Sequence, residues 1–209
     1  MSRKNPPPIK PWVIFDFDYT LFDTTEFKKD IFALFRDCGV SESYMASSYK
    51  SYLASHDVYD LISHCEYLTR SGVPCSRARV EEFLSHPFEH YLVKGAKEML
   101  KELRAKGHRL ILLTKGAERF QLTKIRQAGL ASFFDEVRIV RTKEKEIEKM
   151  KIPEGSYFIN DDAAETERIM RAYPKLHYLL FVDSHTNPAG ITISIPKITA
   201  LREILYVIR

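Results

Sequence analysis

Cysteine is scarce in this 209-residue sequence: only Cys38, Cys65 and Cys75 occur, an odd number without CxxC spacing. This pattern argues against a disulfide framework or a zinc site and is typical of free thiols in a reducing compartment. Long apolar runs are missing as well, since no stretch approaches the length that crosses a membrane. The first residues, MSRKNPPPIKP, carry charge without an apolar segment behind them, so no signal peptide is expected. We therefore predict a cytoplasmic protein with no membrane partner.

A large excess of charge of one sign is also missing. The 32 Lys and Arg residues exceed the 28 Asp and Glu residues only enough for a net charge of +4. No basic block carries interleaved aromatic residues, so no nucleic acid partner is expected. There is no internal repeat and no low-complexity tract, and no pattern indicates an oligomeric state. An apolar content of 44% with 12% aromatic residues is typical of a globule with a substantial core.

Short apolar runs alternate with helical patterns along most of the chain. The runs occupy 12–15, 109–114, 136–140, 156–160 and 177–182, and the helical patterns occupy 95–107, 117–130, 143–152 and 163–173. Most of the runs lack strict alternation, as expected for strands buried on both faces. Strands that alternate with helices require right-handed crossovers and a parallel sheet. The sequence therefore predicts an α/β fold, a doubly wound parallel sheet.

One long interruption divides this alternation. Residues 25–92 contain no convincing buried strand, and their apolar residues recur at helical spacing. A structureless loop of this length is improbable in a compact domain. We predict an inserted all-helical subdomain at 25–92, an α/β core at 12–24 and 93–209, and a short N-terminal arm at 1–11.

Polar side chains follow the predicted strands where each strand ends. Ligands bind at this edge of an open parallel sheet. Side chains two apart in an extended chain point to the same side, which brings two carboxylates together after the first strand. The strand-end set consists of Asp16 and Asp18, Thr114 and Gly116, Lys143, and Asp161 and Asp162. Three or four carboxylates at one edge repel one another unless a cation binds between them, and Mg²⁺ suits oxygen ligands and phosphate.

The remaining strand-end groups suit a phosphate dianion. Thr114 offers a hydroxyl, Lys143 an ammonium, and Gly116 a turn at the start of a helix. Each group alone also has an ordinary structural role. Lys143 and Lys145 could be solvated charges, and the acidic pairs could be helix caps.

Four segments together resemble the motifs of the haloacid dehalogenase-like (HAD) superfamily. These segments are DFDYT at 16–20, LLTKG at 112–116, VRTK at 140–143 and FINDDAAE at 158–165. The insertion at 25–92 resembles the mobile helical cap of that superfamily. The sequence departs from the fourth motif, because Asn160 stands in place of glycine and Glu165 in place of the last aspartate. Lys145 is an alternative to Lys143 in the third motif.

The resemblance implies a role for each residue of these motifs. Asp16 would be the nucleophile. Asp18 would transfer protons, with a perturbed pKa, and would ligate Mg²⁺ through its backbone carbonyl. Thr114, Gly116 and Lys143 would hold the phosphoryl group. Asp161 would ligate the metal, with Asp162 and Glu165 in support.

The aspartate at position 18 favours a phosphatase over the branches that resemble dehalogenases, because those branches need no proton donor for an alcohol. We therefore expect a Mg²⁺-dependent phosphomonoesterase that hydrolyses a small phosphorylated metabolite through an aspartyl phosphate. A phosphomutase and a catalytically silent binding module are the alternatives.

Overall fold

The computed structural model describes residues 10–183, 192 and 194–208, and its centre is a six-stranded parallel sheet. The strand order is β3-β2-β1-β4-β5-β6, so the first strand lies in the middle. The strands are β1 (Trp12–Phe15), β2 (Arg109–Lys115), β3 (Glu136–Val140), β4 (Tyr157–Asn160), β5 (His177–Phe181) and β6 (Lys197–Ile198). The predicted doubly wound α/β fold is confirmed.

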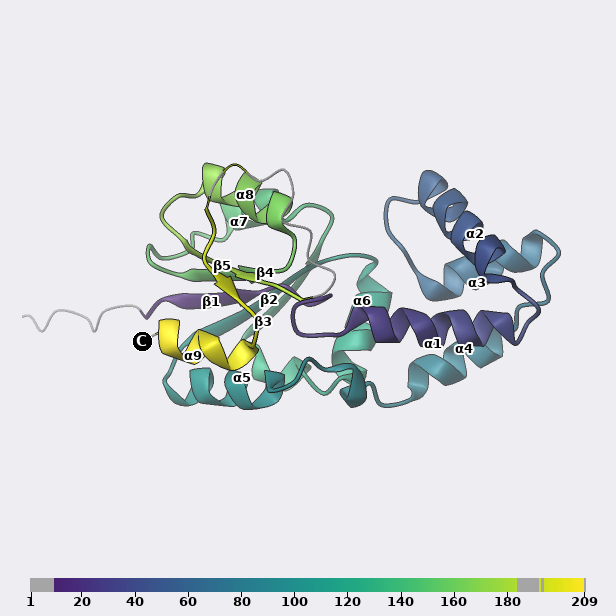
Figure 1. The fold of residues 1–209 in the computed structure, drawn as a ribbon, viewed down its shortest axis with the longest axis horizontal. Coiled ribbons are helices and arrows are strands. Elements are labelled where there is room, and N and C mark those ends of the chain that lie inside the picture. Colours follow the sequence, from purple (N-terminus) through teal and green to yellow (C-terminus); the bar gives the residue numbers. More distant parts are fainter. Residues whose placement is uncertain (1–9, 184–191, 193, 209) are drawn as a thin grey trace, which may run out of the picture.

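Helices cover both faces of this sheet (Figure 1). The helices α7 (Lys143–Lys149) and α8 (Ala163–Ala172) lie on one face, and α5 (Ala96–Ala105) and α9 (Ile204–Val207) lie on the other. The side chains of β1 alternate between the two apolar cores, with Phe15 in one and Ile14 in the other. Burial on both faces explains why the strand sequences read as continuous apolar runs.

Helices also fill the chain between β1 and α5 and extend away from the sheet (Figure 1). They are α1 (Thr24–Arg36), α2 (Glu42–Ser55), α3 (Leu61–Arg70), α4 (Arg77–Ser85) and the short 3₁₀-helix η1 (Glu89–Tyr91). Side chains of Asp23, Ser41, Asp60 and Ser76 accept hydrogen bonds from the first turns of α1 to α4. This helical stretch corresponds to the predicted insertion at 25–92. Its independence as a cap domain stays a prediction.

Aromatic side chains connect the helical stretch to the end of β1. The ring of Phe27 on α1 lies 5.2 Å from Phe22, 5.1 Å from Phe88 and 6.1 Å from Phe120 of α6 (Glu118–Gln127). Phe17 stacks on Phe22 at 4.9 Å. Because these rings are buried and in mutual contact, they fix the loop that follows β1 against α1 and α6.

The C-terminal part of the fold contains elements that the sequence pattern did not predict. Strand β6 has two residues, the 3₁₀-helix η3 spans Leu201–Glu203, and α9 has a single turn. Elements this short carry no detectable periodicity. The predicted arm at 1–11 lies outside the described residues except for residues 10 and 11. Among the described residues, no helix combines the length and the apolar character needed to cross a membrane.

Candidate active site

Asp16 lies at the carboxyl end of the central strand, where the chain leaves the sheet. Its backbone N–H still donates to the carbonyl of Ile159 on β4, at 2.9 Å. A tight turn follows, in which the amides of Leu21 and Phe22 both donate to the carbonyl of Phe17. Within the turn, Tyr19 has a left-handed φ of 58°. Directly after β1 the backbone is therefore no longer extended, and successive side chains no longer alternate between the two sides of the strand.

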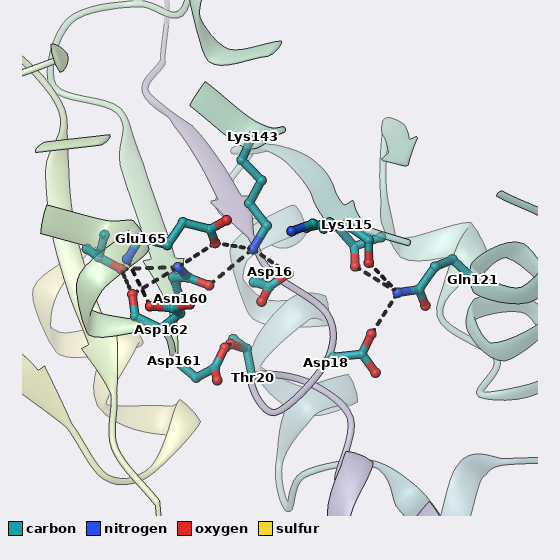
Figure 2. A network of polar contacts seen from close by, with 12 residues as sticks. Asp16, Asp18, Thr20, Lys115, Gln121, Lys143, Asn160, Asp161, Asp162 and Glu165 are labelled. Carbon is teal, nitrogen blue, oxygen red and sulfur yellow. Dashed lines mark hydrogen bonds and ion pairs between the residues drawn. The ribbon is translucent and has the colours of Figure 1, made fainter. Parts of the chain in front are cut away.

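This turn separates the two carboxylates that the sequence pattern placed together. Figure 2 shows Asp16 beside Lys143, whereas Asp18 points toward Gln121. The expectation of three or four converging carboxylates is therefore wrong in this structure. Among the described residues, no three His, Cys, Asp or Glu side chains are grouped as a metal site. The cause is the turn at 17–22, which aims position 18 at α6 and not along the sheet edge.

Lys143 is the cation beside Asp16. Its Nζ lies 2.9 Å from Asp16 Oδ1 and 2.8 Å from Glu165 Oε2, and its side chain is only 3% exposed. Burial lowers the pKa of the ammonium, but the two carboxylates outweigh burial and raise the pKa above its ordinary value. Lys145, the alternative from the sequence, is exposed. The structure thus places Lys143 at the predicted site and Lys145 at the surface.

The two departures from the fourth motif contact each other and Lys143. The buried amide of Asn160 donates from Nδ2 to Glu165 Oε2 at 3.1 Å and accepts from Lys143 Nζ at 3.3 Å (Figure 2). Asp162 has a different position, because its Oδ1 accepts from the amide of Glu165 at 2.8 Å and caps α8. Asn160 and Glu165 therefore hold Lys143, and Asp162 holds the helix that carries Glu165.

Asp161 is the second carboxylate at Asp16. Burial, repulsion from Asp16 and a hydrogen bond between the two side chains outweigh the attraction of Lys143 and together raise the pKa of Asp161 to about 8. Burial also raises the pKa of Asp16. The hydroxyl of Thr20 lies 3.4 Å from Asp161 Oδ1. Two adjacent, desolvated carboxylates form the donor set that a hard dication stabilises, so these residues fit Mg²⁺.

Thr114 and Gly116 mark the end of β2 next to Asp16. The buried Thr114 hydroxyl accepts a bond from Gln121 Nε2 at 3.3 Å, which leaves its own O–H available as a donor. The amide of Gly116 donates to the carbonyl of Val140 at 3.3 Å, so it is not directed at a ligand. A Cβ at position 116 would lie 2.7 Å from Gln121 Cγ. Glycine is needed here for the close approach of Gln121.

Asp18 is held by side chains that the sequence analysis did not single out. Lys124 Nζ lies 2.6 Å from Asp18 Oδ1, and Gln121 Nε2 lies 2.7 Å from Oδ2. The hydroxyl of Thr24 donates to Oδ1 at 2.6 Å. Burial raises the pKa of the Asp18 carboxyl, but Lys124 and these hydrogen bonds outweigh burial and lower it. The perturbation therefore favours the ionised form of Asp18.

Replacing Lys124 by methionine should destabilise the protein, because Asp18 then loses its cation. We expect the free energy of unfolding to fall by about 3 kcal/mol, as for loss of one partner of a buried ion pair. Urea unfolding measures this. Arg126→Met, at an exposed position of the same helix, should change it by less than about 0.5 kcal/mol.

The double variant Asp18→Asn/Lys124→Met should recover part of the loss, since no uncompensated charge remains. Strictly additive losses from the two single variants would show that the side chains do not interact.

Residues 13–151 match the family of haloacid dehalogenase-like hydrolases. No curated protein matches the sequence. A solved structure from Burkholderia xenovorans LB400, described as a haloacid dehalogenase-like hydrolase, superposes with a TM-score of 0.79 at 20% identity, over 95% of this chain and 96% of that one. The HAD-hydrolase YfnB of Bacillus subtilis, bound to magnesium, gives 0.67 at 14% identity, over 97% and 100%. L-2-haloacid dehalogenase of Xanthobacter autotrophicus gives 0.58 at 15%, over 96% and 99%.

The family match covers more than half of the chain, so the chain belongs to the haloacid dehalogenase-like hydrolases. It is therefore an enzyme of the hydrolase class. The solved structures are less than 25% identical to it and establish the shared fold.

Proposed function

We propose that this hydrolase is a Mg²⁺-dependent phosphomonoesterase that acts on a small phosphorylated metabolite. The contact of Asp16 with both Lys143 and Asp161 carries the proposal, because it sets a carboxylate nucleophile between a fixed cation and a metal-binding carboxylate. A transferring phosphoryl group needs positive charge on both sides of its equatorial oxygens. Asp18, two residues farther on, supplies the group that exchanges protons with the alcohol and with water.

The reaction proceeds in two steps on Asp16. A carboxylate oxygen of Asp16 attacks phosphorus, the bond from phosphorus to the alcohol oxygen breaks, and Asp18 in its protonated form protonates the departing oxygen. Water then attacks the aspartyl phosphate and gives its proton to Asp18, which restores Asp16 and releases inorganic phosphate. The contact with Lys124 keeps Asp18 ionised, which is the form that can receive the proton of the water, and protonation of the departing oxygen in the first step requires that contact to loosen.

The residues around Asp16 have distinct tasks. Asp16, Asp161 and the backbone carbonyl of Asp18 would hold Mg²⁺, which when bound neutralises charge between the nucleophile and the phosphoryl oxygens. Lys143 and the Thr114 hydroxyl bind those oxygens from the other side. Asn160 and Glu165 keep Lys143 in place and touch no substrate atom.

A screen of phosphorylated metabolites for released phosphate tests this function. We expect hydrolysis with Mg²⁺ and a loss of at least about a hundredfold after chelation, since a bound metal contributes several kcal/mol to such reactions. Re-addition of Mg²⁺ should restore the rate. Hydrolysis that is unchanged after exhaustive chelation would contradict the metal assignment.

The same screen separates the phosphatase from its relatives and alternatives. Chloride release from chloropropionic acid, the compound bound covalently in the Xanthobacter enzyme, is not expected. Isomerised sugar phosphate in place of free phosphate would indicate a phosphomutase. Absence of both products across the screen would indicate a binding module.

A further inference from the structure

A cavity with a volume of about 380 Å³ extends from Asp18 toward the helical stretch. One end is formed by Asp18, Lys115 and Gly116, next to the proposed phosphoryl site. The opposite walls come from α1, α2, the segment at 57–59 and α6. The alcohol part of a phosphate ester on Asp16 would leave in this direction, past Asp18. The lining and the charges of the cavity therefore limit the size, polarity and charge of that alcohol part.

Its walls are mainly aromatic and aliphatic. The apolar residues that line it are Tyr19, Phe27, Ile31, Phe32, Tyr49, Leu53, Val58, Tyr59 and Phe120. Phe32 is 40% exposed, so apolar surface is available for a ligand to cover. These walls favour an apolar body of about the size of a ring.

Most neutral polar side chains of the cavity already make hydrogen bonds, although the buried Gln121 Oε1 has no partner among the described residues. Thr24 and Gln121 are bound to Asp18, and the hydroxyl of Tyr59 lies 3.1 Å from His64 Nδ1. The several hydroxyls of a sugar would find few partners here. Because unpaired polar groups cost binding energy, this lining disfavours a sugar phosphate.

Two ammonium groups of the cavity, those of Lys115 and Lys28, have no carboxylate within 4 Å among the described residues. Lys124 is paired with Asp18, and Asp57 lies 2.6 Å from Arg141 Nη1. Lys115 ends β2, and Figure 2 shows its side chain extending toward Lys143 and Asp16, on the phosphoryl side.

Lys28 on α1 is the remaining lysine of the cavity. Its Nζ donates to the Tyr19 hydroxyl at 2.6 Å and lies 5.2 Å from the centre of that ring. No acidic side chain of the described residues lies within 4 Å of this nitrogen.

From this arrangement we propose that the substrate is a phosphomonoester whose alcohol part has an apolar, ring-sized body and a carboxylate that binds Lys28. A carboxylate carries one negative charge, which matches one ammonium, whereas a second phosphate would bring nearly two. The inference rests on the proposed function for the phosphoryl end. Lys28 then determines specificity, because an uncharged alcohol of the same shape leaves its ammonium without a partner.

Binding of two phosphonates, measured by isothermal titration calorimetry with Mg²⁺ present, tests this inference without any turnover. The probes are (4-carboxybenzyl)phosphonate and benzylphosphonate, which differ only in the carboxylate. The wild type should bind the carboxylated probe about tenfold more tightly, as expected for one partly buried charge-assisted contact. Lys28→Met should bring the two affinities within about twofold. The matched control is Lys29→Met, since Lys29 is 63% exposed on the same helix and should keep the tenfold ratio.

Three results would overturn the inference: equal affinities in the wild type, a ratio that survives Lys28→Met, or no binding of either probe. Thermal unfolding of Lys28→Met shows whether the variant is folded. If it is not, Lys28→Gln, which keeps most of the stem, should lose the ratio in the same way. Hydrolysis of benzyl phosphate is scored separately. It tests the proposed function, so a phosphatase with no carboxylate preference refutes only the substrate class.

Discussion

Asp16→Asn is expected to reduce kcat for phosphate release by roughly 10⁴- to 10⁶-fold, the range found when a covalent nucleophile is removed. Asparagine has nearly the same shape but cannot attack phosphorus as a carboxylate does. The substitution also removes the repulsion with Asp161, which partly offsets the lost attraction to Lys143. The variant should therefore stay folded. Steady-state phosphate release measures the rate, and circular dichroism checks the fold.

Asp23→Asn is a suitable control, because Asp23 is an aspartate of the same loop that caps α1 and lies outside the proposed reaction centre. It should retain turnover within a few-fold, since asparagine is also a good N-cap residue. Hydrolysis by Asp16→Asn at a rate close to that of the wild type would rule out Asp16 as the nucleophile.

Lys143→Met is expected to lower both activity and stability. Loss of one cation at the transferring group should reduce kcat by roughly 10²- to 10³-fold. The buried carboxylates of Asp16 and Glu165 also lose their common partner, so the free energy of unfolding should fall by about 3–5 kcal/mol. Phosphate release and urea unfolding measure the two effects.

Lys145→Met is the matched control for that variant. Lys145 is exposed one half-turn along the same helix, and its loss should change the free energy of unfolding by less than about 0.5 kcal/mol. A large loss of activity in Lys145→Met with a mild effect of Lys143→Met would reverse the assignment of the phosphate-binding lysine.

The sheet could be predicted from the sequence because its strands are buried on both faces. Continuous apolar runs such as 12–15 and 109–114 are typical of buried parallel strands when helical patterns separate them. Because parallel strands end at the same edge of the sheet, the ends of these runs also predict that Asp16, Thr114 and Asp161 lie at one edge. Strand β6 escaped prediction, since two residues at the sheet edge leave no pattern and owe their position to tertiary contacts.

The site was less predictable than the sheet, because its details depend on side-chain direction. The turn after β1 sends Asp18 away from Asp16, which strand alternation could not indicate. Lys124 was not predicted as a site residue, although it lies four residues after Phe120 on the apolar face of 117–130. A lysine on such a face, following a strand-end hydroxyl, is the signal that would have identified it. No pattern could show that Asn160 and Glu165 together support Lys143.

The central place of β1 also affects how the chain folds. This first strand pairs Ile14 with Ile111 on one side and with Phe158 on the other, so all of its hydrogen-bonded neighbours are remote in sequence. Such high contact order slows folding, because long loops must close before any pairing is gained. During synthesis, β1 cannot complete its pairing until β4 has left the ribosome. The carboxylate of Asp16 therefore meets Lys143 and Asp161 only once β4 is available, so a nascent chain that ends before β4 lacks the proposed active centre.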